Sequence, residues 1–319
     1  MPHAASQRWE DDAVIVIVAP GQGSQKPGFL APWLELPGVP ERLRSLSDAA
    51  GVDLVEHGTV SDADTIRDTL VAQPLIVAAG ILTLDALGDR AALAAGVAGH
   101  SVGEITAAVA AGVLTAEDAM ALVGERARAM ADAAAATPTG MAAVIGADEA
   151  VLEARLEELG LQPANYNGGG QIVVAGAVDA LAELAAAPPE RARVIPLQTA
   201  GAFHTDFMAP AVERFRSKAA ATATADPTTT LWTNRDGSVV ASGSAFLDLV
   251  VGQVSTPVRW DRCMAAFQDA SVTGLVELAP AGALTGLAKR GLRGVPSVGI
   301  TSPDDLDAAV ELLESGASA

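Results

Sequence analysis

Hydrophobic and polar positions alternate along this chain in the pattern of an α/β protein. Short apolar runs predict strands at residues 14–18, 91–98, 231–233, 273–278 and 297–300. Periodicity and capping residues predict helices at residues 74–87, 105–111, 116–136 and 257–269, and a last one after Ser302. Strands that alternate with helices pair in a mostly parallel sheet with helices on both faces, so we expect the α/β fold class.

Residues 138–198 follow a different order of elements. Their pattern predicts strand 141–147, helix 148–159, strand 162–167, a glycine turn at 168–170, strand 171–176, helix 178–186 and strand 193–197. This order is the ferredoxin-like pattern. We therefore predict a ferredoxin-like subdomain at 138–198, inserted into a body formed by residues 1–137 and 199–319. Residues 137–140 and 198–201 would be its hinges, and ligands often bind at such junctions.

Composition narrows the class without naming the chemistry. With 319 residues, 50% of them hydrophobic and only 3% aromatic, the chain can bury a sizeable and mostly aliphatic core. The longest uncharged apolar stretch, 69–84, is interrupted by Gln73 and Pro74 and is shorter than the roughly 18 residues that suggest a membrane span. The N-terminus shows no basic-then-apolar pattern, so we expect neither a signal peptide nor a membrane partner.

Charge and cysteine usage exclude further classes. The formal net charge of −19 argues against a nucleic-acid partner, which would require a basic face. The single cysteine, Cys263, excludes an intrachain disulfide and is compatible with a reducing cytoplasm. We interpret it as a small core residue rather than a nucleophile. No Cys/His/Asp cluster has the spacing of metal ligands, so we expect no metal.

A Gly-His-Ser-Val-Gly sequence at residues 99–103 is the strongest chemical signal in the chain. It lies between a predicted strand and a predicted helix. A serine at such a sharp turn holds its side chain out of the sheet, and the flanking glycines let a substrate approach. The helix that begins at Val102 directs backbone N–H groups toward the same point, where an anionic intermediate can be stabilised. We therefore interpret Ser101 as a nucleophile.

A serine nucleophile needs a base, and the chain has only four histidines. His3 lies in the N-terminal tail, and His57 lies in a polar loop, where a surface role is the simpler interpretation. His100 directly precedes Ser101, so its side chain should point away and pack under the turn. His204 lies where the insertion rejoins the body, which makes it the candidate base.

Five separated motifs together resemble the motif set of a known protein family. They are Gly-Gln-Gly-Ser-Gln at 21–25, the serine motif at 99–104, Arg126, Ala-Phe-His at 202–204, and Gln253 followed by Pro-Val-Arg-Trp at 257–260. In this order, over residues 14–290, the chain resembles the malonyl-CoA:acyl-carrier-protein transacylases, relatives of the acyltransferase domains of polyketide and fatty-acid synthases. The resemblance implies an α/β-hydrolase-like body that carries a ferredoxin-like insertion.

The resemblance also implies a mechanism. Ser101 would attack the thioester carbonyl of malonyl-CoA while His204 takes its proton. The oxyanion would lie between the backbone N–H groups of Gln22 and Val102. The backbone carbonyl of Gln253 would orient the histidine, with the carboxylate of Asp206 as the alternative. The thiol of a carrier protein's phosphopantetheine arm would then take the malonyl group from the serine. No bound cofactor is implied.

Arg126 is the specificity residue by resemblance. The malonyl carboxylate must enter an apolar pocket, and a guanidinium can bind both of its oxygens. Without the resemblance, a solvated helix face would be the simpler interpretation, as it is for Arg128. Val102 and Phe203 match malonyl-selecting patterns, because a bulky Phe203 leaves less space at the α-carbon.

The resemblance is less complete in the insertion. Asn165 and Asn167 would line the groove, although three glycines at 168–170 replace the Ser-Pro-Gly of many family members and should loosen the turn. Carrier proteins are typically acidic, as this chain is, so docking would need a local basic patch. The available clusters are Arg191 and Arg193 on the insertion, and Lys289, Arg290 and Arg293 near the C-terminal side.

Three functions remain open at this point. A transacylase of fatty-acid or polyketide synthesis, acting in the cytoplasm as a monomer, is the first. A serine hydrolase or thioesterase on a related scaffold is the second, but it would not need the buried cation that Arg126 implies. A non-catalytic adaptor for carrier proteins is the third, and the presence of both Ser101 and His204 argues against it.

Overall fold

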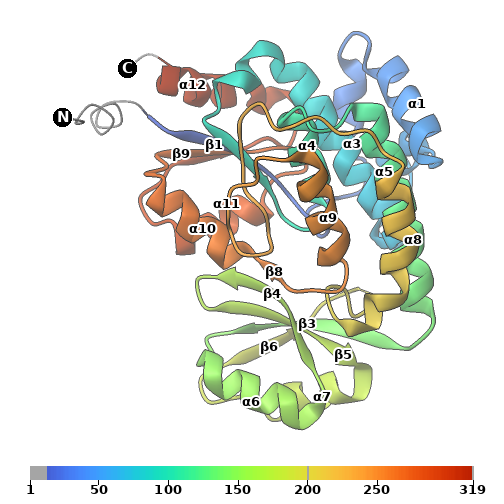
Figure 1. The fold of residues 1–319 in the computed structure, drawn as a ribbon, viewed down its shortest axis with the longest axis vertical. Coiled ribbons are helices and arrows are strands. Elements are labelled where there is room, and N and C mark those ends of the chain that lie inside the picture. Colours follow the sequence, from blue (N-terminus) through green and yellow to red (C-terminus); the bar gives the residue numbers. More distant parts are fainter. Residues whose placement is uncertain (1–12, 200, 318–319) are drawn as a thin grey trace.

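The computed structural model describes residues 13–199 and 201–317, and this part of the chain forms two sheets that lie one beyond the other along the long axis (Figure 1). All neighbouring strands of the first sheet are parallel. Its strand order is β10 (Ser297–Gly299), β9 (Gly274–Glu277), β1 (Ile15–Ala19), β2 (Gly96–Gly99) and β7 (Thr230–Leu231). The prediction of a parallel sheet in an α/β fold is therefore confirmed.

The second sheet is mixed. Its strand order is β6 (Arg193–Pro196), β3 (Thr139–Ile145), β5 (Gln171–Ala177), β4 (Gln162–Gly168) and β8 (Val258–Arg259). Its pairs are antiparallel except for β4 with β8, which are parallel. Helices α6 (Glu149–Leu159) and α7 (Val178–Ala186) pack on this sheet at the end of the molecule farther from the first sheet (Figure 1).

The other α-helices lie around the first sheet (Figure 1). They are α1 (Val39–Ala50), α2 (Leu54–Thr59), α3 (Thr69–Leu87), α4 (Gly103–Ala110), α5 (Ala116–Ala135), α8 (Ala209–Ala220), α9 (Gly243–Gln253), α10 (Trp260–Asp269), α11 (Ala283–Gly291) and α12 (Leu306–Ala317). Short 3-10 helices span Ala31–Glu35, Thr65–Arg67, Gly88–Leu93, Asp206–Met208 and Pro303–Asp305. Thr115 caps α5 through its side chain, as the sequence predicts, and Asp148 caps α6 in the same way.

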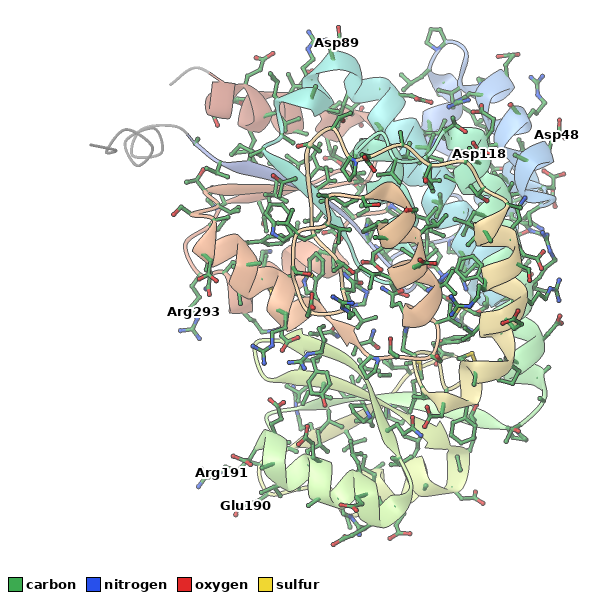
Figure 2. All side chains as sticks on the ribbon, in the orientation of Figure 1. Asp48, Asp89, Asp118, Glu190, Arg191 and Arg293 are labelled. Atoms are coloured by element: carbon green, nitrogen blue, oxygen red, sulfur yellow. The ribbon has the colours of Figure 1, made fainter. Side chains whose placement is uncertain are left out.

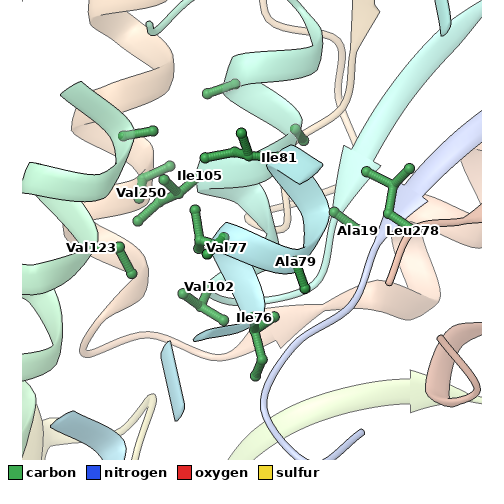
Figure 3. Packing of buried hydrophobic residues seen from close by; sticks show 14 of the residues in the cluster. Ala19, Ile76, Val77, Ala79, Ile81, Val102, Ile105, Val123, Val250 and Leu278 are labelled. Carbon is green, nitrogen blue, oxygen red and sulfur yellow. The ribbon is translucent and has the colours of Figure 1, made fainter. Parts of the chain in front are cut away.

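Helix α3 lies at the centre of the core. Figure 3 shows Ile76, Val77 and Ile81 of α3 among side chains of the neighbouring helices. Over residues 69–93 this segment passes the length and hydropathy test for a membrane span, which corrects the expectation that it is too short. However, 72% of its most apolar window is buried inside the protein, as expected of a core helix that is apolar on every side.

Three predicted boundaries are wrong. Helix α3 begins at Thr69 and not at Pro74, because the Asp68 side chain accepts the Leu70 N–H and caps the helix one turn earlier. Strand β2 is shorter than residues 91–98, because a 3-10 helix occupies Gly88–Leu93. The helix predicted at 257–269 begins only at Trp260, because Val258 and Arg259 extend the second sheet.

The carboxyl ends of the parallel strands meet at the edge of the first sheet that faces the second. Ser101 follows β2 there, and its turn passes very close to β1. A Cβ on Gly99 would lie 2.0 Å from the Gly103 carbonyl, and one on Gly103 would lie 2.2 Å from the Ala19 oxygen. Glycine is therefore required at both positions of the serine motif for steric reasons.

Candidate active site

The turn after β2 presents Ser101 in a left-handed conformation, with φ of +54°. This conformation is uncommon for a residue with a side chain and is typical of a strained strand-to-helix elbow. The Ser101 N–H donates to Asn234 Oδ1 at 2.8 Å, and its Oγ lies 2.7 Å from His204 Nε2. The hydroxyl therefore faces a base at hydrogen-bond distance.

His204 is the only histidine in the described residues that contacts Ser101 Oγ. Its Nδ1 lies 2.8 Å from the backbone oxygen of Gln253, which can only accept a hydrogen bond, so Nδ1 carries the proton and Nε2 is free to accept. Burial, and after it the positive charge of Arg126, lower the pKa of His204 to about 3. The imidazole is therefore neutral at pH values near 7.

Asp206 does not orient the histidine. Its carboxylate is exposed and accepts a hydrogen bond from Gln162 Nε2 at 3.1 Å, whereas a carbonyl occupies the position next to His204 Nδ1. The Gln253 alternative is the one that the geometry favours.

Arg126 reaches the same point from α5, where its side chain is 1% exposed. Its Nη1 donates to Gln73 Oε1 at 2.5 Å, and its Nη2 lies 3.3 Å from Gln253 Oε1 and 3.4 Å from Ser101 Oγ. Its Nε has no partner among the described residues. Burial lowers the pKa of Arg126 to about 10, and Glu104 partly offsets this shift. The cation is thus buried with neutral hydrogen-bond partners, and Arg128 instead bonds Glu125 and the Ala50 carbonyl in a half-exposed position.

These groups open into a cavity of about 410 Å³ between the two sheets. Its apolar lining comes from α5, from the second sheet, from the segment before His204 and from α11, and it includes Met130, Met141, Ala143, Val173, Phe203 and Leu287. Asn165 and Asn167 line it from β4, as the sequence predicts. Such a cavity with a few convergent polar groups is typical of a small-molecule site.

Gln22 and Val102 also line the cavity. The side chain of Gln22 is held by the Arg67 carbonyl and Thr69. In the described part of the chain, no acceptor binds the backbone N–H of either Gln22 or Val102. Two free N–H groups beside a nucleophile are what an oxyanion hole requires.

His100 corrects the expectation that it only packs under the turn. Its Nε2 lies 3.0 Å from Asn167 Oδ1 in the second sheet, and its ring meets the edge of Trp260 at 5.7 Å. His100 therefore connects the nucleophile turn to the opposite wall of the cavity. The turn beyond Asn167 has three glycines with positive φ, and Gly169 at +56° has a conformation that proline cannot adopt.

The other candidates lie outside the cavity. His57 Nδ1 bonds Ser61 Oγ at 2.9 Å, and His3 lies outside the described residues. Cys263 is buried, its thiol donates to the Thr233 carbonyl, and burial raises the pKa of the thiol. Among the described residues, no group of three or more His, Cys, Asp and Glu side chains could hold a metal ion.

The basic clusters differ in their relation to the cavity. Arg191 is 87% exposed and pairs with Glu190 at 3.5 Å, and Arg193 lies on strand β6. Lys289 and Arg290 end α11, and Arg290 lines the cavity. Arg293 follows them on the outer surface, well separated from Arg191 (Figure 2).

Sequence reasoning missed Glu104 and Asn234. Glu104 is fully buried in α4, and burial raises the pKa of its carboxyl to about 7. It accepts hydrogen bonds from the Asn234 N–H and from Gln253 Nε2. Glu104 is the last residue of the serine motif at 99–104, which was a usable signal, whereas nothing in the sequence connects Asn234 to Ser101.

The chain is similar to known proteins over nearly its whole length. Residues 16–312 match the family model described as acyl transferase domain. The malonyl CoA-acyl carrier protein transacylase of Mycobacterium bovis is 53% identical over 302 residues, which cover 94% of this chain and 100% of that protein. The crystal structure of MCAT from Mycobacterium tuberculosis has a TM-score of 0.90 at 53% identity and covers 94% of this chain and 99% of that one. PlMCAT:AntF, a type II PKS acyl-carrier protein in complex with its malonyl-transacylase, has a TM-score of 0.87 at 28% identity, with 94% and 99% covered.

The low pKa of His204 predicts that its ring stays neutral as the pH falls. Nitrogen NMR of the histidine side chains should show an Nδ1–H tautomer for His204 that does not titrate between about pH 8 and about pH 5, whereas a free imidazole titrates near 6.5. Arg126→Ala should raise this pKa, because it removes a nearby positive charge, and Arg128→Ala should leave it unchanged. Titration of His204 near 6.5 in the wild type would contradict the prediction.

Proposed function

The chain belongs to the acyl transferase domain family, and on that premise we propose a mechanism in which a serine carries the acyl group from one thiol to another. The protein is an acyltransferase that moves the malonyl group of malonyl-CoA to the phosphopantetheine thiol of an acyl carrier protein. It supplies extender units for fatty-acid or polyketide synthesis. The observation that carries the mechanism is the 2.7 Å contact between Ser101 Oγ and His204 Nε2 beside the buried Arg126.

In the first half-reaction Ser101 is acylated. His204 Nε2 takes the hydroxyl proton as Ser101 Oγ attacks the thioester carbonyl, and the N–H groups of Gln22 and Val102 stabilise the oxyanion. When the tetrahedral intermediate collapses, the carbon–sulfur bond breaks and His204 returns the proton to the CoA thiolate. The Gln253 carbonyl stabilises the imidazolium, because it accepts the hydrogen bond from Nδ1.

The second half-reaction runs the same steps with another thiol. The phosphopantetheine thiol gives its proton to His204 and attacks the malonyl-serine ester. The bond between Ser101 Oγ and the acyl carbon breaks, and Oγ regains the proton from His204. Two successive half-reactions on one serine give ping-pong kinetics.

The acyl group is chosen at the buried end of the cavity. Arg126 binds the malonyl carboxylate, since its Nε is unpaired and its other donors are held by uncharged groups. Phe203 lies against the α-carbon, where Val102 is also close, and so disfavours a methyl branch. A single methyl group changes such a preference by only about 1–3 kcal/mol. Asn165 and Asn167 line the path of the pantetheine arm.

Several broader features also belong to the proposal. We propose that residues 138–198 form a ferredoxin-like subdomain inserted into an α/β-hydrolase-like body of residues 1–137 and 199–319. The alternation of strands with helices in each part supports this division. We further propose that the protein acts in the cytoplasm without a bound cofactor, and its single cysteine is compatible with that reducing compartment. A monomer suffices, because the proposed nucleophile, base and cation all come from one chain.

Intact-protein mass spectrometry after mixing with malonyl-CoA tests the function. The wild type should gain the mass of one malonyl group and lose it when holo carrier protein is added, and Ser101→Ala should gain nothing. Free malonate without an adduct would indicate a hydrolase instead. If the wild type shows no adduct and no turnover, the non-catalytic adaptor is the function that remains.

Arg126→Ala should separate malonyl from acetyl transfer. Removal of one partner of a buried charge pair costs about 3–5 kcal/mol, so kcat/KM for malonyl-CoA should fall by at least about a hundredfold. The fall for acetyl-CoA should be much smaller, because that substrate has no carboxylate. Arg128→Ala is the matched control on the same helix and should change neither. Equal losses for both substrates would contradict the carboxylate site.

The basic cluster at the end of α11 is the preferred carrier dock, because Arg290 lines the cavity while Arg191 is already paired. A Lys289→Ala/Arg293→Ala variant leaves Arg290 in place and should raise KM for the carrier protein by roughly three- to tenfold, with malonyl-CoA kinetics unchanged. Arg191→Ala/Arg193→Ala is the matched comparison. An effect confined to that second variant would place the dock on the insertion, and no effect of either would exclude these four side chains from the dock.

A further inference from the structure

The side chain of Glu104 lies directly behind the nucleophile turn and is fully buried in the first turn of α4. Both of its oxygens accept hydrogen bonds. Oε1 accepts from the Asn234 N–H at 2.7 Å, and Oε2 accepts from Gln253 Nε2 at 2.5 Å. A buried carboxylate is costly unless it is well partnered, so its position here needs an explanation.

The first of these partners holds the nucleophile. Asn234 Oδ1 accepts the N–H of Ser101 at 2.8 Å, and Asn234 Nδ2 donates to the Gly99 carbonyl at 2.6 Å. The two hydrogen bonds lie on either side of the left-handed turn. Because Ser101 is in the left-handed conformation, its N–H has no hydrogen-bond partner in a regular helix or strand. The hydrogen bonds to Asn234 instead fix the conformation that aims Ser101 Oγ at the base.

The second partner holds the base and the cation. The backbone carbonyl of Gln253 accepts from His204 Nδ1, and the Gln253 side-chain oxygen accepts from Arg126 Nη2. Gln253 Nε2 also donates to Asn234 Oδ1 at 3.0 Å, which closes the network. The orientation of the Gln253 amide therefore depends on the acceptor that Glu104 supplies.

We propose that Glu104 is a positioning residue that fixes Ser101, His204 and Arg126 in one geometry through Asn234 and Gln253. It touches none of the reacting atoms. The inference rests on the proposed function, because it assigns no role to Glu104 other than to align the groups that carry the acyl transfer.

The chemistry of the site requires a carboxylate. Both partners of Glu104 are donors, so a glutamine at this position would direct an NH2 group at one of them. An aspartate is one methylene shorter and would not reach both Asn234 and Gln253. A negative charge also suits the site because Arg126 has no other anionic partner near it among the described residues, and Glu104 raises the pKa of that guanidinium.

Glu104→Gln tests the proposal in the intact protein. The rate of acylation of Ser101 by malonyl-CoA, divided by the amount of serine that is acylated at completion, should fall by about 10- to 100-fold, as expected for a small misalignment of reacting groups. Acetyl transfer should also fall by a large factor, because the misalignment affects Ser101 and His204 for every substrate, and malonyl transfer should fall somewhat more because Arg126 belongs to the same network. This pattern differs from that of Arg126→Ala.

Glu277→Gln is the matched control. Glu277 is also fully buried, and its carboxylate accepts backbone N–H groups of Gly282, Leu284 and Thr285 at the start of α11. It has no hydrogen bond to the Ser101 network among the described residues. We expect a lower Tm and an acylation rate per reactive serine within about twofold of the wild type.

Asn234→Ala tests the network if Glu104→Gln folds poorly. It removes the acceptor of the Ser101 N–H and should also slow acylation per reactive serine. The double variant should be only slightly slower than the slower single one, because both substitutions break one chain of contacts.

Three results would overturn the proposal. The first is a Glu104→Gln protein that loses Tm but keeps its rate per reactive serine. The second is a loss confined to malonyl-CoA, and the third is full additivity with Asn234→Ala. Each can be distinguished from failure of the proposed function, which would appear as the absence of any malonyl adduct on the wild type.

Discussion

The positive charge of Arg126 is the constraint on which the rest of the site depends. It is buried, and its direct partners are two amide oxygens and one hydroxyl, none of which neutralises it. Burying a charge without a counter-ion costs several kcal/mol of folding free energy. The negative charge of Glu104 lies close enough to Arg126 to reduce this cost, so the fold can keep the cation buried. An anion that enters the cavity restores the missing pair. In the proposed function, this incompletely compensated cation is what gives the cavity its affinity for a carboxylate.

The same charge determines the state of the base. Burial and Arg126 both disfavour the imidazolium form of His204, so the free protein holds a neutral imidazole with Nε2 available to Ser101. A carboxylate bound at Arg126 offsets the positive charge of the guanidinium. Protonation of the His204 ring during the reaction then costs less free energy, because the guanidinium repels the imidazolium more weakly. Binding of the acyl group and readiness for proton transfer thus depend on one electrostatic arrangement.

The sequence predicts local structure well and long-range contacts poorly. The parallel sheet, the cap at Thr115, and the helix at 178–186 follow from short-range patterns. Strand β8 was missed because two residues after a proline carry no strand signal of their own. The role of Ser101 could be predicted from its motif, and that of His204 from its position where the insertion rejoins the body. Arg126 became meaningful only through the family resemblance, since its neighbours in sequence suggest an ordinary exposed helix face.

The network behind Ser101 could not be predicted because it joins residues that are 130 and 149 positions apart. Its connection to the opposite wall of the cavity follows from the missed strand. In β8, Val258 pairs with Asn165 of β4, while the N–H of Arg259 donates to the Asn234 carbonyl at 2.7 Å. Two consecutive residues therefore connect the wall of the cavity to the residue that fixes the nucleophile turn. In the proposed mechanism a thiol on a flexible arm must outcompete water for the acyl-serine. The contacts of β8 hold the wall of the cavity in a fixed position relative to Ser101, where that ester would form.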